Sequence, residues 1–235
     1  MSAIKGARER ARGEVTAAIK EEARRQLAHD GAAKLSLRAV ARELGMVSSA
    51  LYRYFPSRDD LLTALIIDAY DALGAAAEAA LAEAGGADPV RRWTAVCRAV
   101  RAWALAHPHE YALIYGSPVP GYSAPGDTTG PAARVGLALI AILRDAHEAG
   151  ELSVATEEAA PPLSVQDDAR RLADVLDIDL PAPTMAGLTA TWAQLFGLVN
   201  FEVFGHFNHV VEAREAFFDQ ATAGLARQIG LLPGE

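Results

Sequence analysis

The chain has 235 residues, of which 51% are apolar, enough for one large domain or for a small domain joined to a larger one. Its formal net charge of −8 argues against a polybasic tail, and its single cysteine, Cys97, excludes an internal disulfide framework. Residues 1–60 hold 12 Lys and Arg against 8 Asp and Glu, whereas the rest of the chain is acidic. This asymmetry predicts a basic contact end on an acidic body, suited to an anionic polymer.

No segment has the composition of a secretion signal or of a membrane span. Residues 1–15 are charged and contain no long apolar run. The most apolar stretch, residues 185–204, contains polar side chains such as Gln194 and Glu202. We therefore expect a cytoplasmic protein without a membrane partner, and we interpret residues 185–204 as a buried helix.

Apolar residues at helical spacing predict four helices in the N-terminal third of the chain. The first spans roughly residues 10–29 and ends before Gly31, and the second ends at Gly45, because glycine readily adopts the left-handed conformation found after helix ends. The fourth continues to about residue 84. Three serines stand where helices begin and are expected to cap them: Ser36, Ser48 and Ser57, the last in a capping box with Asp60.

The rest of the chain also predicts helices, separated by loops rich in Gly and Pro. Asp88 and Pro89 are residue types expected at a helix start, and Pro108 ends that helix. Irregular loops are expected over residues 116–131 and 151–164. Further helices are expected near residues 110–115, 135–149, 165–178, 185–204 and 211–229. No segment favours a β-strand, so the predicted fold class is all-α.

The helix expected at residues 185–204 has two different faces. Small residues line one side, namely Ala186, Ala190, Ala193 and Gly197. Large apolar residues, among them Leu188, Trp192 and Leu195, cover the opposite side. Because both faces are apolar, both must be buried. We predict that the large face packs on the core of its own chain and that the small face meets a second subunit.

Residues 36–62 have the pattern of a helix-turn-helix. This motif needs two short helices joined by a tight turn, and Ala41, Gly45 and Leu51 fit the crossing point, the turn and the buried anchor. Its second helix presents polar and aromatic side chains to DNA. The predicted DNA-binding residues are Ser48, Ser49, Tyr52, Arg53 and Tyr54 on this helix, with Arg38 and Arg58 beside it for phosphate groups.

The order G-x-V-S-x-x-L-Y-R-Y-F-P-S-R-x-x-L over residues 45–61 resembles the tetracycline-repressor (TetR) family of one-component regulators, and the resemblance is close over residues 15–65. The chain departs from the common family pattern at Met46 and Val47, and at Leu37 and Ala50. Further along, the segments His-Pro-His-Glu-Tyr from His107 and Phe-Gly-His from Phe204 resemble the regulatory domain of an actinobacterial subgroup of that family.

The resemblance implies an all-α homodimer with two domains. Residues 1–56 would form the helix-turn-helix domain and residues 57–235 the ligand-binding and dimerisation domain, with a helix over residues 57–84 connecting them. The last two long helices would form a four-helix dimer interface, to which we assign Phe218 and Leu225 together with the small face. Binding of a small molecule would shift the fourth helix and release a palindromic DNA operator, as in a repressor.

The implied ligand cavity would be lined by aromatic side chains and a few polar groups, as is usual for small-molecule sites. The candidates are Trp103, His107, Tyr111, Tyr115, Trp192, Phe196 and Asn200. Most buried aromatic residues are core residues, so the ordinary core is the alternative for each of them. The sequence leaves the identity of the ligand open.

Two other kinds of site have weaker support. His107 with His109, and His206 with His209, are close enough in sequence for metal ligands, but no Cys, HExxH or ExxH motif accompanies them. A role at helix ends or on the surface is therefore the preferred interpretation. Cys97 is interpreted as a small buried side chain, and a redox-sensing thiol is the alternative because two arginines follow it closely.

Enzymatic activity has little support, because the sequence contains no G-x-S-x-G, P-loop or G-x-G-x-x-G motif. We expect no enzyme, no cofactor and no metal. The predicted partners are double-stranded operator DNA, a second copy of the chain and a small-molecule effector. Two alternatives remain open at this point. One is a helical ligand carrier or enzyme that retains a helix-turn-helix unit, and the other is an activator of the same family.

Overall fold

The computed structural model describes residues 2–153 and 160–232. Within these ranges the chain is helical, and its only β-type pairing is an isolated antiparallel bridge between Leu152 and Leu231. The all-α prediction is therefore confirmed. Among the described residues, no helix is long and apolar enough to cross a membrane.

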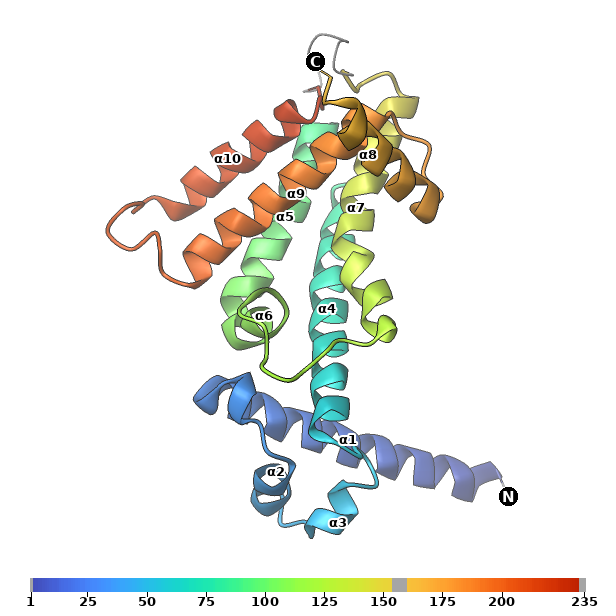
Figure 1. Cartoon of the computed structure of the whole chain (residues 1–235), viewed down its shortest axis with the longest axis vertical. Helices are drawn as coiled ribbons and strands as arrows, with labels where there is room; N and C mark the ends of the chain where they lie inside the picture. The colour runs from blue at the N-terminus through green and yellow to red at the C-terminus, as the bar shows by residue number, and fades with distance from the viewer. Residues whose placement is uncertain (1, 154–159, 233–235) are drawn as a thin grey trace. The chain divides into compact units, whose positions relative to one another are not determined.

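The helices follow one another with short connections (Figure 1). The N-terminal elements are α1 (Ser2–Asp30), the 3-10 turn η1 (Ala32–Lys34), α2 (Leu37–Glu43), α3 (Ser48–Leu51) and α4 (Arg58–Glu83). They are followed by α5 (Pro89–Ala106), α6 (Pro108–Tyr115), the 3-10 turn η2 (Gly126–Thr128) and α7 (Thr129–Glu148). The last helices are α8 (Leu163–Leu176), α9 (Ala182–Val203) and α10 (Arg214–Gln228).

The chain divides into two compact units that do not coincide with the predicted domains. The first unit comprises Met1–Ala72 and His107–Ala132, and the second comprises Leu73–Ala106 and Ala133–Glu235. The first unit thus contains α6 and the loop after it, in addition to the N-terminal helices. The predicted division at residue 56 remains a prediction about autonomous domains.

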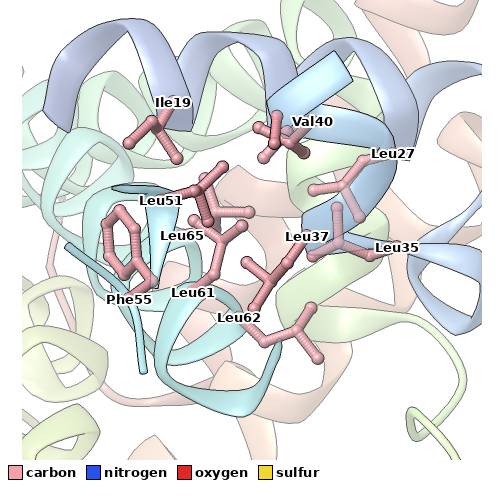
Figure 2. Close-up of a cluster of buried hydrophobic side chains, with 12 residues drawn as sticks. Ile19, Leu27, Leu35, Leu37, Val40, Leu51, Phe55, Leu61, Leu62 and Leu65 are labelled. Carbon is pink, nitrogen blue, oxygen red and sulfur yellow. The ribbon is translucent and has the colours of Figure 1, made fainter. Parts of the chain in front are cut away.

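The core of the first unit is a cluster of buried aliphatic side chains (Figure 2). From α1, Ile19 and Leu27 point into it, because residues eight positions apart lie on the same face of a helix. From α3 and the turn after it come Leu51, which is fully buried, and Phe55. From α4 come Leu61, Leu62 and Leu65, and from α6 and its loop Leu113, Val119 and Tyr122 pack against the cluster.

In the second unit, α5 and α7 each bury one apolar face. On α5 the buried residues include Trp93, Val100 and Trp103, and on α7 they include Leu139 and Ile142. The helices α9 and α10 pack against each other and against α5, and the three run side by side in Figure 1. The large face of α9 is buried as predicted, except for Trp192, which is 38% exposed, and Val203, which is half-buried.

Two of the three predicted serine caps are confirmed. The Ser36 hydroxyl accepts a hydrogen bond from the backbone N–H of Ala39 at 3.4 Å, and the Ser57 hydroxyl accepts one from Asp60 at 3.1 Å. Ser48, in contrast, is the first residue of α3 and not its cap. The position before the helix is taken by Val47, with an extended backbone and no side-chain hydrogen bond to the helix.

Several helix limits differ from the predictions. The helix α1 begins at Ser2, about two turns before residue 10, and α7 begins at Thr129, inside the predicted loop. The helix α10 begins only at Arg214, since residues 211–213 are not helical. Part of the second predicted loop, residues 154–159, lies outside the described residues.

Candidate nucleic-acid interface

The turn between α2 and α3 is fixed by two backbone hydrogen bonds at Gly45. The N–H of Met46 donates to the carbonyl of Ala41 at 2.8 Å, and the N–H of Gly45 donates to that of Arg42 at 3.1 Å. These two bonds form a Schellman motif, which needs a left-handed residue after the helix. Gly45 meets this need with φ 64°. The turn therefore sets the direction in which α3 leaves α2.

The helix α3 is short, and the segment after it continues as tight turns. The backbone N–H groups of Tyr54 and Phe55 both donate to the carbonyl of Leu51, at 2.8 and 3.1 Å. Leu51 and Phe55 face inward. Ser49, Tyr52 and Arg53 are exposed, whereas Ser48 is half-buried. Among the residues predicted to bind DNA from α3, these three have the most surface free for a base or a phosphate.

Tyr54 has a packing role that was not predicted. Its ring is half-buried and packs against the core cluster. The guanidinium of Arg12, on α1, lies 5.3 Å from the centre of that ring, and its Nη2 donates to the backbone carbonyl of Arg53 at 3.3 Å. Such a cation–π contact stabilises the pair modestly at an exposed site. Arg12 therefore connects α1 to the end of residues 48–55, which are called the α3 segment below.

The two arginines predicted to bind phosphate differ in their surroundings. Arg38, in the first turn of α2, is exposed. Arg58, at the start of α4, donates from Nη2 to the carbonyl oxygens of Ala32 and Ala33 at 2.9 and 3.4 Å. Its guanidinium thus holds η1 against α4. The sequence contains no local indication of this contact, because the partners are 25 and 26 residues away.

An ion network joins α1, α4 and α6 in the same unit. The carboxylate of Asp68 accepts from Lys20 and from Arg24, both at 2.8 Å, and Arg24 also donates to Glu110 at 3.0 Å. The hydroxyl of Tyr122, in the loop after α6, lies 2.9 Å from that of Thr63 on α4. The helices that carry the helix-turn-helix are therefore bound to α6 and its loop by polar contacts as well as by the core.

The residues predicted to bind a ligand divide between the two units. His107, Tyr111 and Tyr115 belong to the first unit, where the rings of Tyr111 and Tyr115 lie 5.3 Å apart. Burial raises the pKa of both phenols, so they remain protonated and can donate hydrogen bonds at neutral pH. The other four belong to the second unit: Trp103, Trp192, Phe196 and Asn200.

Within the second unit, the rings of Trp192 and Phe196 lie 5.3 Å apart. Phe196 is buried, and Asn200 is half-buried one turn further along α9. Trp103 is buried on α5. A single cavity lined by all seven residues stays a prediction.

The predicted dimer residues fall into two groups. On α9, Ala190 and Ala193 are exposed, and Ala186 and Gly197 are half-buried, so this face has surface to offer a partner. On α10, however, Phe218 and Leu225 are 2% and 6% exposed within a single chain. They have almost no area left for a second subunit, and their neighbour Phe217 is the exposed aromatic residue.

The alternative sites find no support in the described part of the chain. Cys97 is fully buried, and burial raises the pKa of its thiol, so it lacks the accessible thiolate that a redox sensor needs. Among the described residues, no three His, Cys, Asp or Glu side chains gather as metal ligands would. The His206 ring instead lies 5.0 Å from that of Phe201.

Comparison with known proteins agrees with this geometry. The sequence model for "Bacterial regulatory proteins, tetR family" matches residues 19–65, and that for "Tetracyclin repressor-like, C-terminal domain" matches residues 93–225. The HTH-type transcriptional regulator Rv1816 of Mycobacterium tuberculosis (strain ATCC 25618 / H37Rv) is 41% identical over 207 residues, which cover 86% of each chain.

Two solved structures have the same fold. The crystal structure of SCO4313 is 35% identical, covers 92% of this chain and 97% of that chain, and superposes with a TM-score of 0.72. RolR in complex with its ligand resorcinol is 16% identical, with a TM-score of 0.54 over 94% of this chain and 90% of that chain. The helix-turn-helix geometry and both halves of the sequence therefore agree: the chain belongs to the TetR family of bacterial transcriptional regulators, with α2 and α3 as its DNA-binding motif.

Proposed function

We propose that the protein is a homodimeric cytoplasmic repressor that binds a palindromic operator and is released from it by a small apolar or aromatic ligand. The observation that carries this proposal is the exposed apolar face of α9 and α10. Large exposed apolar patches on a folded chain usually mark a site of association.

This face combines small and large residues in the way that close helix packing requires. On α9, Ala190 and Ala193 are exposed, and Phe201, about two to three turns further along the helix, is 52% exposed. On α10 the exposed aromatic residue is Phe217. Small residues let a partner helix approach closely, and the aromatic rings supply buried area. The dimer is symmetric, as homodimers generally are, so its two helix-turn-helix motifs bind two inverted half-sites.

The exposed residues of the α3 segment read the bases. Ser49, Tyr52 and Arg53 are assigned to base contacts, and the half-buried Ser48 and Tyr54 flank them. Phosphate contacts are assigned to Arg38 and Arg58. Since Arg58 also donates hydrogen bonds to the carbonyls of η1, it additionally holds η1 against α4.

Ligand binding is proposed on the aromatic residues of the regulatory half. RolR, which has the same fold, binds resorcinol, a small aromatic molecule. Two separate sets of side chains are candidates: in the first unit the tyrosines of α6 supply rings and hydroxyls, and in the second unit the Trp192–Phe196 pair of α9 supplies rings. A ligand that binds the DNA-free protein more tightly than the DNA-bound protein lowers the affinity for DNA. The factor equals the ratio of the two ligand affinities.

The test selects an operator from random duplex DNA with the full chain and measures binding by fluorescence anisotropy. We expect enrichment of an inverted repeat bound by one dimer. Enrichment of a single unpaired half-site refutes the dimer, and no enrichment refutes specific binding and favours a ligand carrier or enzyme.

Single variants assign the contacts on the selected DNA. Tyr52→Ala should change which bases are preferred. Arg38→Ala should weaken binding to selected and unrelated DNA by the same factor and leave the melting temperature unchanged. Arg58→Ala should weaken binding similarly but also lower the melting temperature. An Arg38→Ala protein with altered base preference would contradict the phosphate assignment.

A thermal-shift screen of small aromatic compounds, followed by release of the labelled operator, tests the ligand. A reporter gene behind the operator decides the direction of control. Its expression should fall when the protein is present and recover with the ligand, whereas an activator would raise it.

A further inference from the structure

The first turns of α1 extend beyond the core of the unit to which they belong. Every residue from Ala7 to Glu14 is exposed, and the first fully buried residue of the helix is Ile19. Figure 1 shows these turns running out past α3. The sequence model of the family's N-terminal domain matches residues 19–65, so these turns lie before the matched segment.

The two arginines at Arg8 and Arg12 lie on the face of α1 that points toward the helix-turn-helix. At about 100° per residue, both lie within about 20° of the direction of Ile19, whereas Arg10 lies about 180° away. Figure 2 shows Ile19 pointing from α1 toward Leu51 of α3. The same face is thus apolar over the core and cationic where α1 passes beyond it.

The contacts of Arg12 show that this cationic face lies against the end of the α3 segment. The Arg12 guanidinium lies over the ring of Tyr54 and donates to the carbonyl of Arg53, at the end of the α3 segment. Arg8 follows about 6 Å further along the helix axis, at about 1.5 Å per residue. Among the described residues, the first residue of α1 that makes an ion pair is Lys20, so the Arg8 guanidinium is not engaged by a carboxylate of that part of the chain.

We infer that the N-terminal turns of α1 are a second DNA contact, in which Arg8 binds a backbone phosphate next to those held by α2 and α3. Arg12 is a positioning residue that fixes the helix against the α3 segment. The occupant is DNA because the surface is cationic and continuous with the helix-turn-helix, and DNA carries a phosphate charge for about every 1.7 Å of its axis. The inference rests on the proposed function for the operator and the dimer.

The contact belongs to the backbone and not to the bases. An arginine on an exposed helix beside the α3 segment can donate two parallel hydrogen bonds to a phosphate group. Phosphate groups are the same at every base pair, so this contact does not depend on the DNA sequence. Arg8 should therefore add affinity and salt dependence without adding base preference. Arg10, two residues away and on the opposite face, has the same charge and exposure but no such position, which makes it the matched control.

The experiment measures operator affinity of the full-length Arg8→Ala and Arg10→Ala proteins between 50 and 200 mM salt. The plot of log K against log salt has a negative slope. Loss of one phosphate contact per subunit should make this slope shallower by about 2 per dimer. The native protein should therefore lose its advantage as salt is added: the ratio of its DNA affinity to that of Arg8→Ala should fall about tenfold between 50 and 200 mM salt. Arg10→Ala should change the slope by less than half of the change seen in Arg8→Ala. Arg8→Lys should retain the slope of the native protein.

Four outcomes overturn or support the inference. Equal slope changes in Arg8→Ala and Arg10→Ala show a diffuse charge effect and refute it, and so does an unchanged slope in Arg8→Ala. An Arg8→Ala slope change accompanied by altered base preference refutes the phosphate assignment. A slope change confined to Arg8→Ala, equal on operator and unrelated DNA and with native helix content by circular dichroism, supports it. A native protein without operator preference refutes the proposed function instead.

Discussion

The buried ion pair between α5 and α9 should be the costliest polar contact to break. Arg101 donates from Nε and Nη2 to the two carboxylate oxygens of Glu202, both at 2.6 Å. The side chains are only 17% and 6% exposed, and the pairing raises the pKa of Arg101. The Arg101→Met variant leaves a buried carboxylate unpaired, for which losses of about 3–5 kcal/mol are typical.

The same helix supplies the control. Arg98, one turn away, makes the same bidentate contact with Asp219 at 2.6 and 2.9 Å, but its side chain is 58% exposed. An exposed pair of this kind contributes about 0.2–1 kcal/mol, so Arg98→Met should cost far less than Arg101→Met. Both losses are measured by urea unfolding at one fixed protein concentration, because the stability of the proposed dimer would depend on concentration.

Burial of the unpaired charge, and not loss of the bond itself, is the source of the difference. The double variant Arg101→Met with Glu202→Leu should therefore recover most of the stability, to within about 1–2 kcal/mol of the native protein. Equal losses in Arg98→Met and Arg101→Met, or no recovery in the double variant, would refute this reasoning.

Three further outcomes follow from single contacts. Gly45→Ala should cost about 1 kcal/mol in thermal unfolding from its positive φ alone, since no atom lies within 4 Å of an added Cβ. The hydrogen bonds from Arg98 hold the pKa of Asp219 below its ordinary 3.8. The stabilisation from this carboxylate is present above pH 3.8 and is lost as the pH falls through the lowered pKa. Asp219→Asn should therefore have a lower melting temperature than the native protein at pH 6, and the difference should shrink as the pH falls below 3.8. Tyr122→Phe removes the 2.9 Å contact with Thr63 and should lower the unfolding free energy by about 1 kcal/mol; no change would show that this contact is not formed in solution.

Helix positions were predictable where the determinants are local. Ser36, Gly45 and Ser57 act within a few residues of themselves, so the ends of α2 and the start of α4 follow from the sequence. The beginning of α1 does not, because residues 7–14 are exposed and leave no apolar periodicity. Ser48 has a capping side chain, but the extended residue before α3 is Val47, and side-chain type alone does not determine which residue is extended.

The interface was predictable in its position but not in the orientation of each side chain. Ser49 and Tyr52 were expected on the surface and are exposed. Tyr54 and Arg58 turn toward partners on α1 and η1 that are tens of residues away, and no local pattern encodes such pairs. On α10, Phe217 and Phe218 are adjacent and chemically alike, so only the packing of α10 on α5 and α9 decides which of them faces outward.

The composition of the first unit suggests how a signal enters the DNA-binding motif. Because α6 and its loop pack on the same core as α2 and α3, and because Glu110 shares Arg24 with Asp68, a displacement of α6 acts directly on α1 and α4. The helix α5 ends at Ala106 and α6 begins at Pro108, so His107 alone separates them. The chain path from α5 to α6 is therefore one residue long, so the proposed ligand signal has, besides α4, a second covalent route to the core that carries α2 and α3.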